Sequence, residues 1–396
     1  MKSYNKVKYI DSYSHETLHD QYNAAFLAKV CSAFENVEYI VGKSSYRNTN
    51  KLLATCENIK YKLKFIWVVG GKSNIALFFR TLFGAIQNIR FLVFSGKDDL
   101  IIFNFNNFIF LYFANLLTKL LDRTVIIVCH NEMAFVTIDC VHKNLVYNFR
   151  TNIIRYIFKN EKVVLAKNLK FCVLGDSILD NLKKHINFNK ITNFFSVDHP
   201  YIFSERVNKA SKIDLQPSTI KIGVIGTMAQ EKGADILISI AKNINLIENK
   251  AITIQIIGKI ICETNQFEQV GIVLPPDKGK SSLDREIFNQ MVDQLDFILY
   301  LYPVNSYRFT ASGSIMDAIN YNKPILSFKN DFFNYIFNKY GELGFLVDNE
   351  IQMVELIKSI SGSNFKSIDF NFEKVKKSLS PFSKKDDFIN GYNKFN

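Results

Sequence analysis

Short runs of apolar residues alternate along the first half of the chain with segments in which apolar positions recur every three to four residues. The short runs predict buried strands, and the wider spacing predicts amphipathic helices. Strands alternating with helices predict a parallel sheet with helices on both faces. The predicted strands cover residues 37–41, 65–69, 100–105, 124–129 and 171–174, and the predicted helices cover residues 22–34, 109–121 and 146–158.

The second half of the chain repeats this alternation. Strands are predicted at residues 220–225, 252–257, 297–301 and 325–328, and helices at residues 234–243 and 285–294. All seven prolines lie at or beyond Pro200, which marks a change of character there. We therefore predict an α/β protein with two doubly wound, Rossmann-like domains facing a cleft. The predicted parts are a first domain at 1–200, a linker at 201–219, a second domain at 220–368, and a helical tail at 369–396 that packs across the domain boundary.

Two strongly apolar segments raise the question of a membrane. Residues 100–118 lack charge but contain four asparagines, so we interpret them as a buried strand, a turn and an amphipathic helix. Residues 73–92 carry Arg80 and Arg90 between many apolar positions. They fit either a helix packed broadly into the core, the simpler interpretation, or a helix lying on a membrane surface. An integral membrane protein is not indicated. The N-terminal residues lack a secretion-signal pattern, so we expect a cytoplasmic protein. This expectation includes a peripheral position on the inner face of the plasma membrane.

The net charge of +12 is concentrated in the first half of the chain. Residues 1–200 contain 26 Lys and Arg against 15 Asp and Glu, whereas the remainder contains 23 against 22. A basic domain suits anionic partners such as phospholipid headgroups, a pyrophosphate-linked lipid or nucleic acid. A coding bias toward lysine is the alternative, but it would enrich both halves alike. No nucleic-acid-binding module is recognisable, so we expect an anionic membrane surface and no nucleic acid among the partners.

The first candidate site is the turn at residues 226–233, which follows the predicted strand 220–225. Gly226 and Thr227 begin the turn, and Lys232 arrives just before the next helix. A lysine beside the free N–H groups of a helix start can neutralise a diphosphate. An ordinary strand-to-helix turn with a solvated lysine is the simpler interpretation of this turn alone. Gly258, at the end of the neighbouring predicted strand, joins the candidate donor site.

The second candidate site is the segment at residues 305–328, the most informative piece of the sequence. A polar loop with Ser312, Gly313 and Ser314 opens a short helix that carries Asp317, and a buried strand follows. The first N–H groups of a helix lack internal partners and attract anions, and glycine lets the backbone approach a phosphate closely. A surface helix capped by Ser314 is the alternative.

The side chains of this segment suit a phosphorylated ligand with a ribose. Arg308 can meet a phosphate in bidentate fashion, Tyr307 precedes it, and Asp317 can accept hydrogen bonds from ribose hydroxyls. Because both candidate turns follow strands of one predicted parallel sheet, they are expected at the same edge of that sheet, which favours the ligand site.

The first half offers a third candidate at the end of the predicted strand 124–129. His130 and Glu132 follow this strand directly, and in the predicted architecture they face the cleft. Histidine can act as a base near neutral pH, and a carboxylate can share that role. A histidine satisfied within the sheet edge is the alternative.

A fourth candidate lies near the N-terminus, where His15 and His19 are four residues apart. On a helix they would share one face, as Glu16 and Asp20 would. Their spacing resembles a zinc-binding helix, but no further ligand pattern accompanies it and the six cysteines are scattered, so we predict no metal. Contact with an acceptor by His15, Glu16 and His19, or capping of the next helix by Ser14, is the expected role.

These motifs resemble those of two-domain glycosyltransferases of the GT-B fold, chiefly the family-four-like bacterial polysaccharide enzymes. The resemblance rests on G-x5-K-G at 226–233, on D-A-x4-K-P-I at 317–325, and on H-N-E at 130–132, and it is strongest over residues 220–348. It implies a nucleotide-sugar donor held by the second domain, an acceptor held by the first, and transfer without an obligatory metal or other cofactor.

The resemblance also implies roles for single residues. Lys232 looks like the donor-diphosphate lysine, Asp317 stands where the family has its ribose-binding glutamate, and His130 looks like the first-domain histidine near the transferred sugar. Two positions depart from the pattern. Thr227 replaces a usual basic residue, and Phe309 replaces the first glutamate of the family's pair.

The sequence therefore predicts a glycosyltransferase that adds a sugar to a lipid-linked or oligosaccharide acceptor in surface polysaccharide assembly. The diphosphate leaving group would be stabilised by Lys232, Arg308 and the N–H groups at 312–314. If the reaction inverts configuration, the base would come from His130, Glu132, Glu16 or Asp20. Two other functions remain open: a nucleotide-sugar epimerase on the same scaffold, and a non-catalytic protein that binds polyanions through its basic half.

Overall fold

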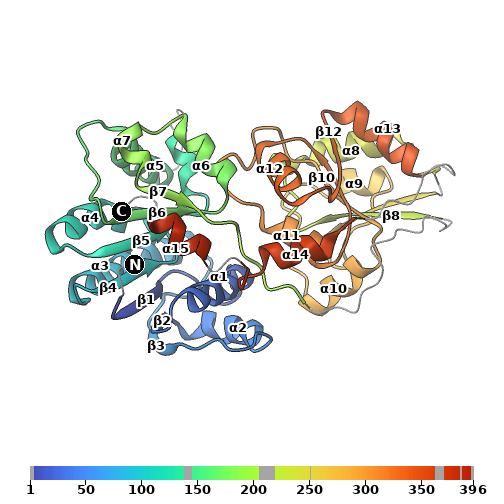
Figure 1. Cartoon of the computed structure of the whole chain (residues 1–396). Coiled ribbons are helices and arrows are strands. Elements are labelled where there is room, and N and C mark those ends of the chain that lie inside the picture. The colour runs from blue at the N-terminus through green and yellow to red at the C-terminus, as the bar shows by residue number, and fades with distance from the viewer. Residues whose placement is uncertain are drawn as a thin grey trace. The chain divides into compact units, whose positions relative to one another are not determined.

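The computed structural model describes residues 4–137, 145–204, 219–249, 251–361, 370–383 and 386–393. The chain forms two compact units, each built around its own sheet (Figure 1). Unit 1 comprises Met1–Ile202, Arg308–Ala311 and Leu379–Asn396, and unit 2 comprises Phe203–Tyr307 and Ser312–Ser378. The residues of the expected tail are thus shared between the two units. Most of the predicted linker, residues 205–218, lies outside the described residues.

Unit 1 contains a seven-stranded sheet in which every neighbouring pair is parallel, in the order β3-β2-β1-β4-β5-β6-β7. Its strands are β1 (Lys6–Asp11), β2 (Val37–Gly42), β3 (Lys62–Ile66), β4 (Asp99–Phe103), β5 (Thr124–Val128), β6 (Leu169–Val173) and β7 (Phe194–Ser196). Its helices are α1 (Asp20–Ala33), α2 (Lys43–Leu53), α3 (Asn74–Phe94), α4 (Phe108–Leu121), the 3-10 helix η1 (Glu132–Val136), α5 (Leu145–Lys159), α6 (Asp176–Lys183), α7 (Phe188–Ile191) and α15 (Asp386–Asn393).

The sequence pattern missed β1, an interior strand of this sheet. In β1, Lys6 and Lys8 alternate with Val7 and Tyr9, so the segment lacks the continuous apolar run of a central parallel strand. The Nζ atom of Lys8 is 2.9 Å from the Asp99 carboxylate, which compensates the lysine charge beside β4. The other strands of unit 1 that the pattern predicted are present within a few residues of their expected bounds.

Unit 2 contains a five-stranded parallel sheet in the order β12-β11-β10-β8-β9. Its strands are β8 (Ile220–Ile225), β9 (Ile252–Ile257), β10 (Phe297–Tyr300), β11 (Ile325–Phe328) and β12 (Gly344–Val347). Its helices are the 3-10 helix η2 (Gln230–Lys232), α8 (Ala234–Asn243), α9 (Asn265–Gln269), α10 (Arg285–Asp293), α11 (Gly313–Asn320), α12 (Asp331–Tyr340), α13 (Glu350–Ile360) and α14 (Phe372–Leu379), whose last residue groups with unit 1. The α/β class with two doubly wound sheets is confirmed.

Two close backbone contacts hold together the loops that follow β8, β9 and β10. A Cβ atom at Gly258 would lie 2.1 Å from the carbonyl oxygen of Gly226, and a Cβ atom at Gly233 would lie 2.3 Å from that of Leu301. Both glycines also have positive φ angles, +145° and +88°. No other residue type fits these positions without displacing a neighbouring loop.

Substituting Gly258 by alanine should therefore destabilise unit 2 by more than the strain of a positive φ angle alone, because the new Cβ atom also clashes with the Gly226 carbonyl oxygen. We expect a loss of at least about 3 kcal/mol in the free energy of unfolding, measured by urea denaturation. Gly341→Ala is the matched control, because Gly341 also has positive φ but a Cβ atom there meets nothing within 4 Å. Equal losses in the two variants would contradict the close-contact argument.

Candidate functional site

The strand orders mark one edge of each sheet as the place for a ligand. In unit 2 the order reverses between β8 and β10, and in unit 1 it reverses between β1 and β4. Ligands of open parallel sheets bind beyond the carboxyl ends of the strands at such reversals. The turn at 226–233 follows β8, and the loop that leads into α11 follows β10. The two predicted donor segments of unit 2 thus meet at the reversal point.

Lys232 ends the 3-10 helix η2, directly before α8. Gly226 has a φ angle of +89°, and Thr227 follows it, half-buried. The Lys232 side chain is half-buried, and this burial lowers the pKa of its ammonium group, while the charge of Glu231 opposes the shift. A partly desolvated lysine gains from an anion beside it, because the anion restores the stabilisation that water no longer supplies.

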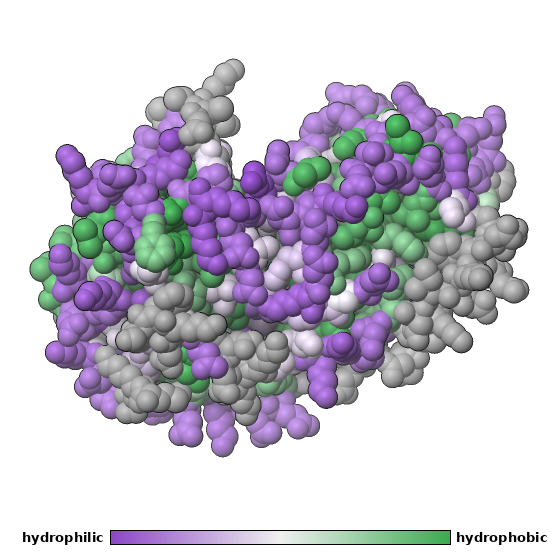
Figure 2. Space-filling model, turned by 45° about the horizontal axis from the view of Figure 1, so that its top comes forward, coloured by the Kyte–Doolittle hydropathy of each residue, from purple (hydrophilic) through white to green (hydrophobic). Residues whose placement is uncertain are grey.

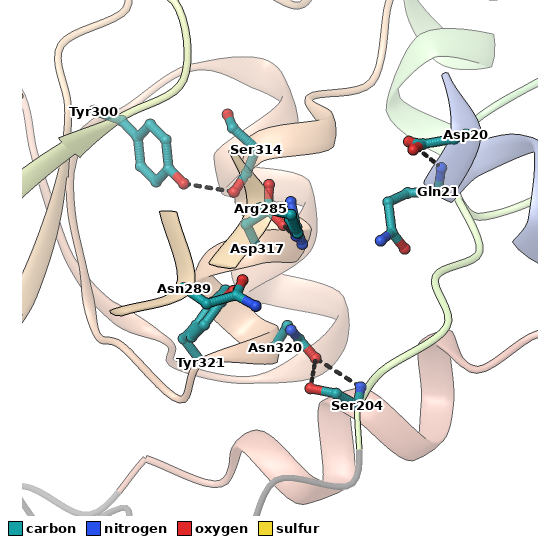
Figure 3. A network of polar contacts seen from close by, with 10 residues as sticks. All are labelled: Asp20, Gln21, Ser204, Arg285, Asn289, Tyr300, Ser314, Asp317, Asn320 and Tyr321. Carbon is teal, nitrogen blue, oxygen red and sulfur yellow. Dashed lines mark hydrogen bonds and ion pairs between the residues drawn. The ribbon is translucent and has the colours of Figure 1, made fainter. Parts of the chain in front are cut away.

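The N-terminus of α11 has no side-chain cap. Ser312 is the N-cap residue, yet its Oγ atom lies 3.0 Å from Oγ of Ser314 and bonds no helical N–H group. The Ser314 Oγ atom is also 3.1 Å from the Tyr302 hydroxyl, and Tyr300 donates to the Ser314 carbonyl oxygen at 2.6 Å (Figure 3). The predicted alternative, a helix capped by Ser314, is therefore wrong, because the serine hydroxyls bond each other and a tyrosine instead.

Gly313 is the first residue of α11, and the space beside its Cα atom is empty. A Cβ atom built on it would meet no other heavy atom within 4 Å. Its φ angle does not need glycine either, since it lies outside the left-handed region. The fold therefore gives no reason for glycine here, whereas a phosphate approaching the first N–H groups of the helix would give one.

Asp317 lies one turn further along α11 and is paired rather than free. Its Oδ1 atom is 3.1 Å from Nη2 of Arg285, which comes from α10 (Figure 3). The pair is half-exposed, so it contributes little stability, but it fixes the direction of the carboxylate. Arg285 was not predicted, because it lies 32 residues from Asp317 and no local pattern connects them.

Tyr307 and Arg308 fall on different sides of the division between the units. Tyr307 belongs to unit 2, where its ring centroid is 4.7 Å from that of Tyr302. Arg308 belongs to unit 1, where its carbonyl oxygen accepts a hydrogen bond from Nδ2 of Asn181 on α6. A donor contact by Arg308 stays a prediction.

The structure explains why phenylalanine stands at position 309. The Phe309 side chain is 6% exposed and belongs to the hydrophobic core of unit 1, where its ring packs against the edge of His185 on the α6–α7 connection. A carboxylate at this position would be desolvated and would lose the apolar contacts of this core. Phe309 thus anchors in unit 1 the short segment Arg308–Ala311, whose flanking residues belong to unit 2.

In unit 1, His130 lies at the carboxyl end of β5 among aromatic rings. The rings of His19, Tyr22 and Phe105 have centroids 5.4, 4.6 and 5.9 Å from its own. Burial, reinforced by the neighbouring His19, lowers the pKa of His130 to about 3. A pKa this low makes the imidazole a weak base, and a catalytic role for His130 stays a prediction.

The tautomer of His130 follows from its partner. Its Nε2 atom lies 2.9 Å from the carbonyl oxygen of Asn104, which can only accept a hydrogen bond. The proton of the neutral ring therefore sits on Nε2, and Nδ1 is left as an acceptor. His130 is thus suited to accept a hydrogen bond from a ligand hydroxyl.

Glu132, rather than His130, titrates near neutral pH. Its side chain is 1% exposed at the start of η1, and its Oε2 atom accepts a hydrogen bond from the backbone N–H of His130 at 2.7 Å. Burial raises its pKa to about 7, although hydrogen bonds and the charge of Arg150 oppose the shift. Its Oε1 atom has no hydrogen-bond partner among the described residues. A buried carboxyl with a neutral pKa is a candidate general base.

The N-terminal candidates do not share a helix. The helix begins at Asp20, His19 precedes it with a positive φ angle of 59°, and His15 and Glu16 lie in turns. The predicted common faces of these residues are therefore wrong. Ser14 does not cap the helix either, because the N-cap residue is His19 and no side chain caps the helix there. Within the described residues, no group of three or more His, Cys, Asp or Glu side chains is placed to hold a metal ion.

Sequence reasoning missed Asp11 and Asn104, which stand at the reversal point of the unit 1 sheet. The fully buried Asp11 is the last residue of β1 and accepts hydrogen bonds from the N–H groups of Tyr13 and Ser14. Asn104 follows β4 and donates to the side chain of Asn23 at 2.8 Å. Because β1 itself was not recognised, Asp11 could not be placed at a strand end.

No family model and no curated protein matches this chain. Solved structures do resemble it. The apo form of the lipopolysaccharide outer core galactosyltransferase WaaB matches with a TM-score of 0.59 and 12% identity, over 98% of this chain and 99% of that chain. WaaG, a glycosyltransferase involved in lipopolysaccharide biosynthesis, matches with a TM-score of 0.55 and 13% identity, over 94% of both chains. Anabaena HepE in complex with UDP matches with a TM-score of 0.53 and 11% identity, over 99% of this chain and 97% of that chain.

The chain has the GT-B fold. The two parallel sheets and their covering helices confirm the architecture that the sequence predicted. At these low identities the likeness concerns the fold, and a fold hosts more than one chemistry. The activity of this GT-B chain must therefore be argued from its own residues.

Replacing Glu132 by glutamine should change how stability depends on pH. The folded protein keeps the Glu132 proton up to about pH 7, whereas the unfolded chain releases it near 4.5, so this group lowers stability as the pH rises through that window. Compared with the wild type, Glu132→Gln should gain up to about 3 kcal/mol between pH 5 and pH 8 in urea denaturation. Glu57→Gln, at an exposed position, is the control and should show no such gain. Parallel pH profiles for Glu132→Gln and the wild type would refute the buried-carboxyl argument.

Proposed function

We propose that this protein is a glycosyltransferase that moves a sugar from a nucleotide-sugar donor to a lipid-linked or oligosaccharide acceptor in surface polysaccharide assembly. The observation that carries the proposal is the uncapped N-terminus of α11, with empty space at Gly313, beside the loop that carries Lys232. Both lie at the carboxyl edge of one parallel sheet. Together they supply N–H groups, hydroxyls and a cation, which is what a nucleoside diphosphate requires.

In this proposal, unit 2 holds the donor. The diphosphate lies against the first N–H groups of α11 and near Lys232, and Asp317 accepts hydrogen bonds from the ribose. Arg285 holds the Asp317 carboxylate in place through its ion pair. When the bond to the sugar breaks, negative charge grows on the diphosphate, and the fixed dipoles and the lysine stabilise that charge. No metal or other cofactor is invoked for this step.

Unit 1 supplies the residues for the acceptor. Glu132 is the candidate base that takes the proton from an acceptor hydroxyl, because its pKa lies near 7. His130 is the candidate for orienting the sugar or the acceptor through its free Nδ1 atom. His15, Glu16 and His19 remain candidate acceptor contacts, on loops that follow β1.

The names of the similar structures support this choice of function. Two are transferases of lipopolysaccharide biosynthesis, and a third was solved with UDP. Another similar structure, with a TM-score of 0.56, is the N-terminal domain of a Candida albicans trehalose-6-phosphate phosphatase. The fold alone therefore does not select the reaction. A nucleotide-sugar epimerase would convert a nucleotide sugar without an acceptor, so incubation with the donor alone distinguishes the two enzymes.

Replacing Lys232 by alanine should weaken the binding of nucleoside diphosphates. Loss of a charge-assisted hydrogen bond predicts an affinity about ten to a hundred times lower, measured by calorimetry across a panel of nucleoside diphosphates. Lys242→Ala is the matched control, because Lys242 is an exposed lysine at the other end of α8. If Lys232→Ala and Lys242→Ala bind alike, the donor-site assignment fails.

Replacing Gly313 by alanine should separate stability from ligand binding. Alanine in a helix is up to about 1 kcal/mol more favourable than glycine, and the added methyl group has room, so the melting temperature should stay equal or rise. The affinity for a nucleoside diphosphate should nevertheless fall about tenfold, because the methyl group occupies the space of a phosphate. Thermal unfolding with and without the nucleotide measures both effects. Unchanged affinity would show that no ligand approaches Gly313.

A further inference from the structure

Helix α3 exposes large apolar side chains on its outer side, whereas a surface helix of a water-soluble protein usually turns such side chains toward the core. Its inner side carries mostly polar or small residues, since Arg80, Thr81 and Asn88 are buried there together with Gly84, Ala85 and Leu92. Its outer side exposes Ile75, Phe78, Phe79, Phe83 and Ile86, the first of them at 70%. Large apolar side chains on contiguous turns of an outward helix face indicate a binding surface rather than a solvent boundary. The predicted alternative of simple core packing does not account for them.

Trp67 extends this apolar side beyond the helix. Its ring centroid is 5.3 Å from that of Phe83, and the side chain is 63% exposed. The segment that carries it is tied to α3, because Gln87 donates to the Trp67 carbonyl oxygen at 2.6 Å and Arg80 donates to the carbonyl oxygens of Val69 and Gly71. We call Trp67 and the five exposed residues of α3 the outer α3 surface.

The neighbouring helices continue the same character. Tyr112, Leu116 and Leu120 are exposed on α4, which packs beside α3. Hydrophobic side chains reach the left-hand surface in Figure 2, on the side where Figure 1 shows α4. Phe149 and Tyr156 are exposed on α5, and the Tyr156 ring stacks 6.5 Å from that of Tyr112.

The charges on these elements are all of one sign. Helices α3, α4 and α5 contain arginines and lysines but no aspartate or glutamate. Lys62 and Lys64 are exposed on the edge strand β3, and Lys72 is exposed just before α3. The Lys64 Nζ atom lies 5.5 Å from the ring of Phe91 on α3, which places the lysine row beside the helix. No ion pair joins these three lysines to another described residue.

We propose that the outer α3 surface docks on an anionic lipid bilayer, with α3 lying along the membrane interface. Apolar side chains would enter the boundary between headgroups and acyl chains, the indole of Trp67 would sit at headgroup level, and Lys62, Lys64 and Lys72 would meet lipid phosphates. This surface does not depend on the proposed transfer reaction.

The helix lies on the membrane and does not cross it. By length and composition α3 could span a bilayer, the one such helix in the described part of the chain. Its inner side is fixed to unit 1, however, because Asn88 accepts a hydrogen bond from Ser12 at 2.8 Å and the Thr81 carbonyl oxygen accepts one from Asn107 at 2.7 Å. Crossing the bilayer would break these bonds and bury Arg80 in hydrocarbon.

A second copy of the chain fits this surface less well than a membrane does. A twofold interface would bring the same patch from both copies together. The cations of α3, α4 and α5 would then face each other without an acidic partner on these helices, which disfavours association. An anionic lipid surface supplies the missing negative charge.

The membrane surface also adjoins candidate acceptor residues of unit 1. A Cβ atom at Gly70, in the segment after Trp67, would lie 2.9 Å from Nε2 of His15. A docked chain would therefore hold His15 close to the headgroup layer. If the proposed transfer reaction is correct, this position favours the lipid-linked acceptor over a soluble oligosaccharide.

The tryptophan of the outer α3 surface permits a direct test without any substitution, because Trp67 is the only tryptophan in the chain. Tryptophan fluorescence of the full chain is recorded with phosphatidylcholine vesicles that contain or lack phosphatidylglycerol. We expect a blue shift and quenching by brominated acyl chains only with the anionic vesicles, and a smaller effect at high salt. An unshifted spectrum with anionic vesicles at physiological salt overturns the proposal.

Flotation with the same vesicles tests the residues themselves. The triple variant Ile75→Ser/Phe79→Ser/Ile86→Ser should bind at least about tenfold more weakly than the wild type. Lys62→Gln/Lys64→Gln/Lys72→Gln should weaken binding about fivefold for each lysine. Ile247→Ser/Ile261→Ser/Ile351→Ser is the matched control, because these isoleucines are similarly exposed in unit 2.

The outcomes separate the alternatives. Because all the substituted side chains are exposed, the variants should unfold at the wild-type temperature. Wild-type-like vesicle binding by the apolar triple variant refutes the surface. A wild-type dimer that becomes monomeric in that variant, without vesicle binding by either, assigns the surface to a second copy instead. Nucleoside diphosphate binding is measured separately, so failure of membrane docking leaves the donor site standing, and the reverse also holds.

Discussion

Parallel strand pairing is the constraint from which the other features of this protein follow. Two parallel neighbours cannot be joined by a tight turn, so the chain must cross the sheet between them, here mostly as a helix. The carboxyl ends of all strands then share one edge, which is why residues as distant as Gly226 and Ser312 reach one place in unit 2. The same crossings cover the sheet faces with helices, and one of those helices, α3, presents its apolar side outward.

The sequence pattern predicted the strands that consist mostly of apolar residues. Helix α8 and strands β8, β9 and β11 have the expected bounds, because an apolar run bounded by glycine or proline has few alternatives in a parallel sheet. It failed at β1, where lysines alternate with apolar residues although the strand lies inside the sheet, between β2 and β4. The compensating charge, Asp99, comes from a strand that lies about ninety residues further along the chain, and no local pattern reveals it.

The candidate site was predictable in its location more than in its chemistry. Glycine-containing turns and loops after the strands indicated where a ligand would approach, and Gly313, at the start of α11, has no folding role that explains it. The state of each side chain depends on neighbours from other elements. The pKa of His130 is low because rings from two other segments, at residues 19–22 and at Phe105, surround it, and Asp317 is paired because α10 brings Arg285 beside it. Phe309 departs from the sequence pattern of the similar family, and its place in the hydrophobic core of unit 1 explains the phenylalanine.

The composition of unit 1 from separate stretches of chain has a consequence for its biosynthesis. Phe388, on α15, is fully buried against Phe26, Phe34 and Phe195, so the hydrophobic core of the first unit includes residues that the ribosome makes after those of unit 2. Unit 2 is nearly complete in the nascent chain before that helix emerges. Until that helix emerges, part of the core of the N-terminal sheet stays open. Apolar surface exposed in this way during synthesis favours aggregation.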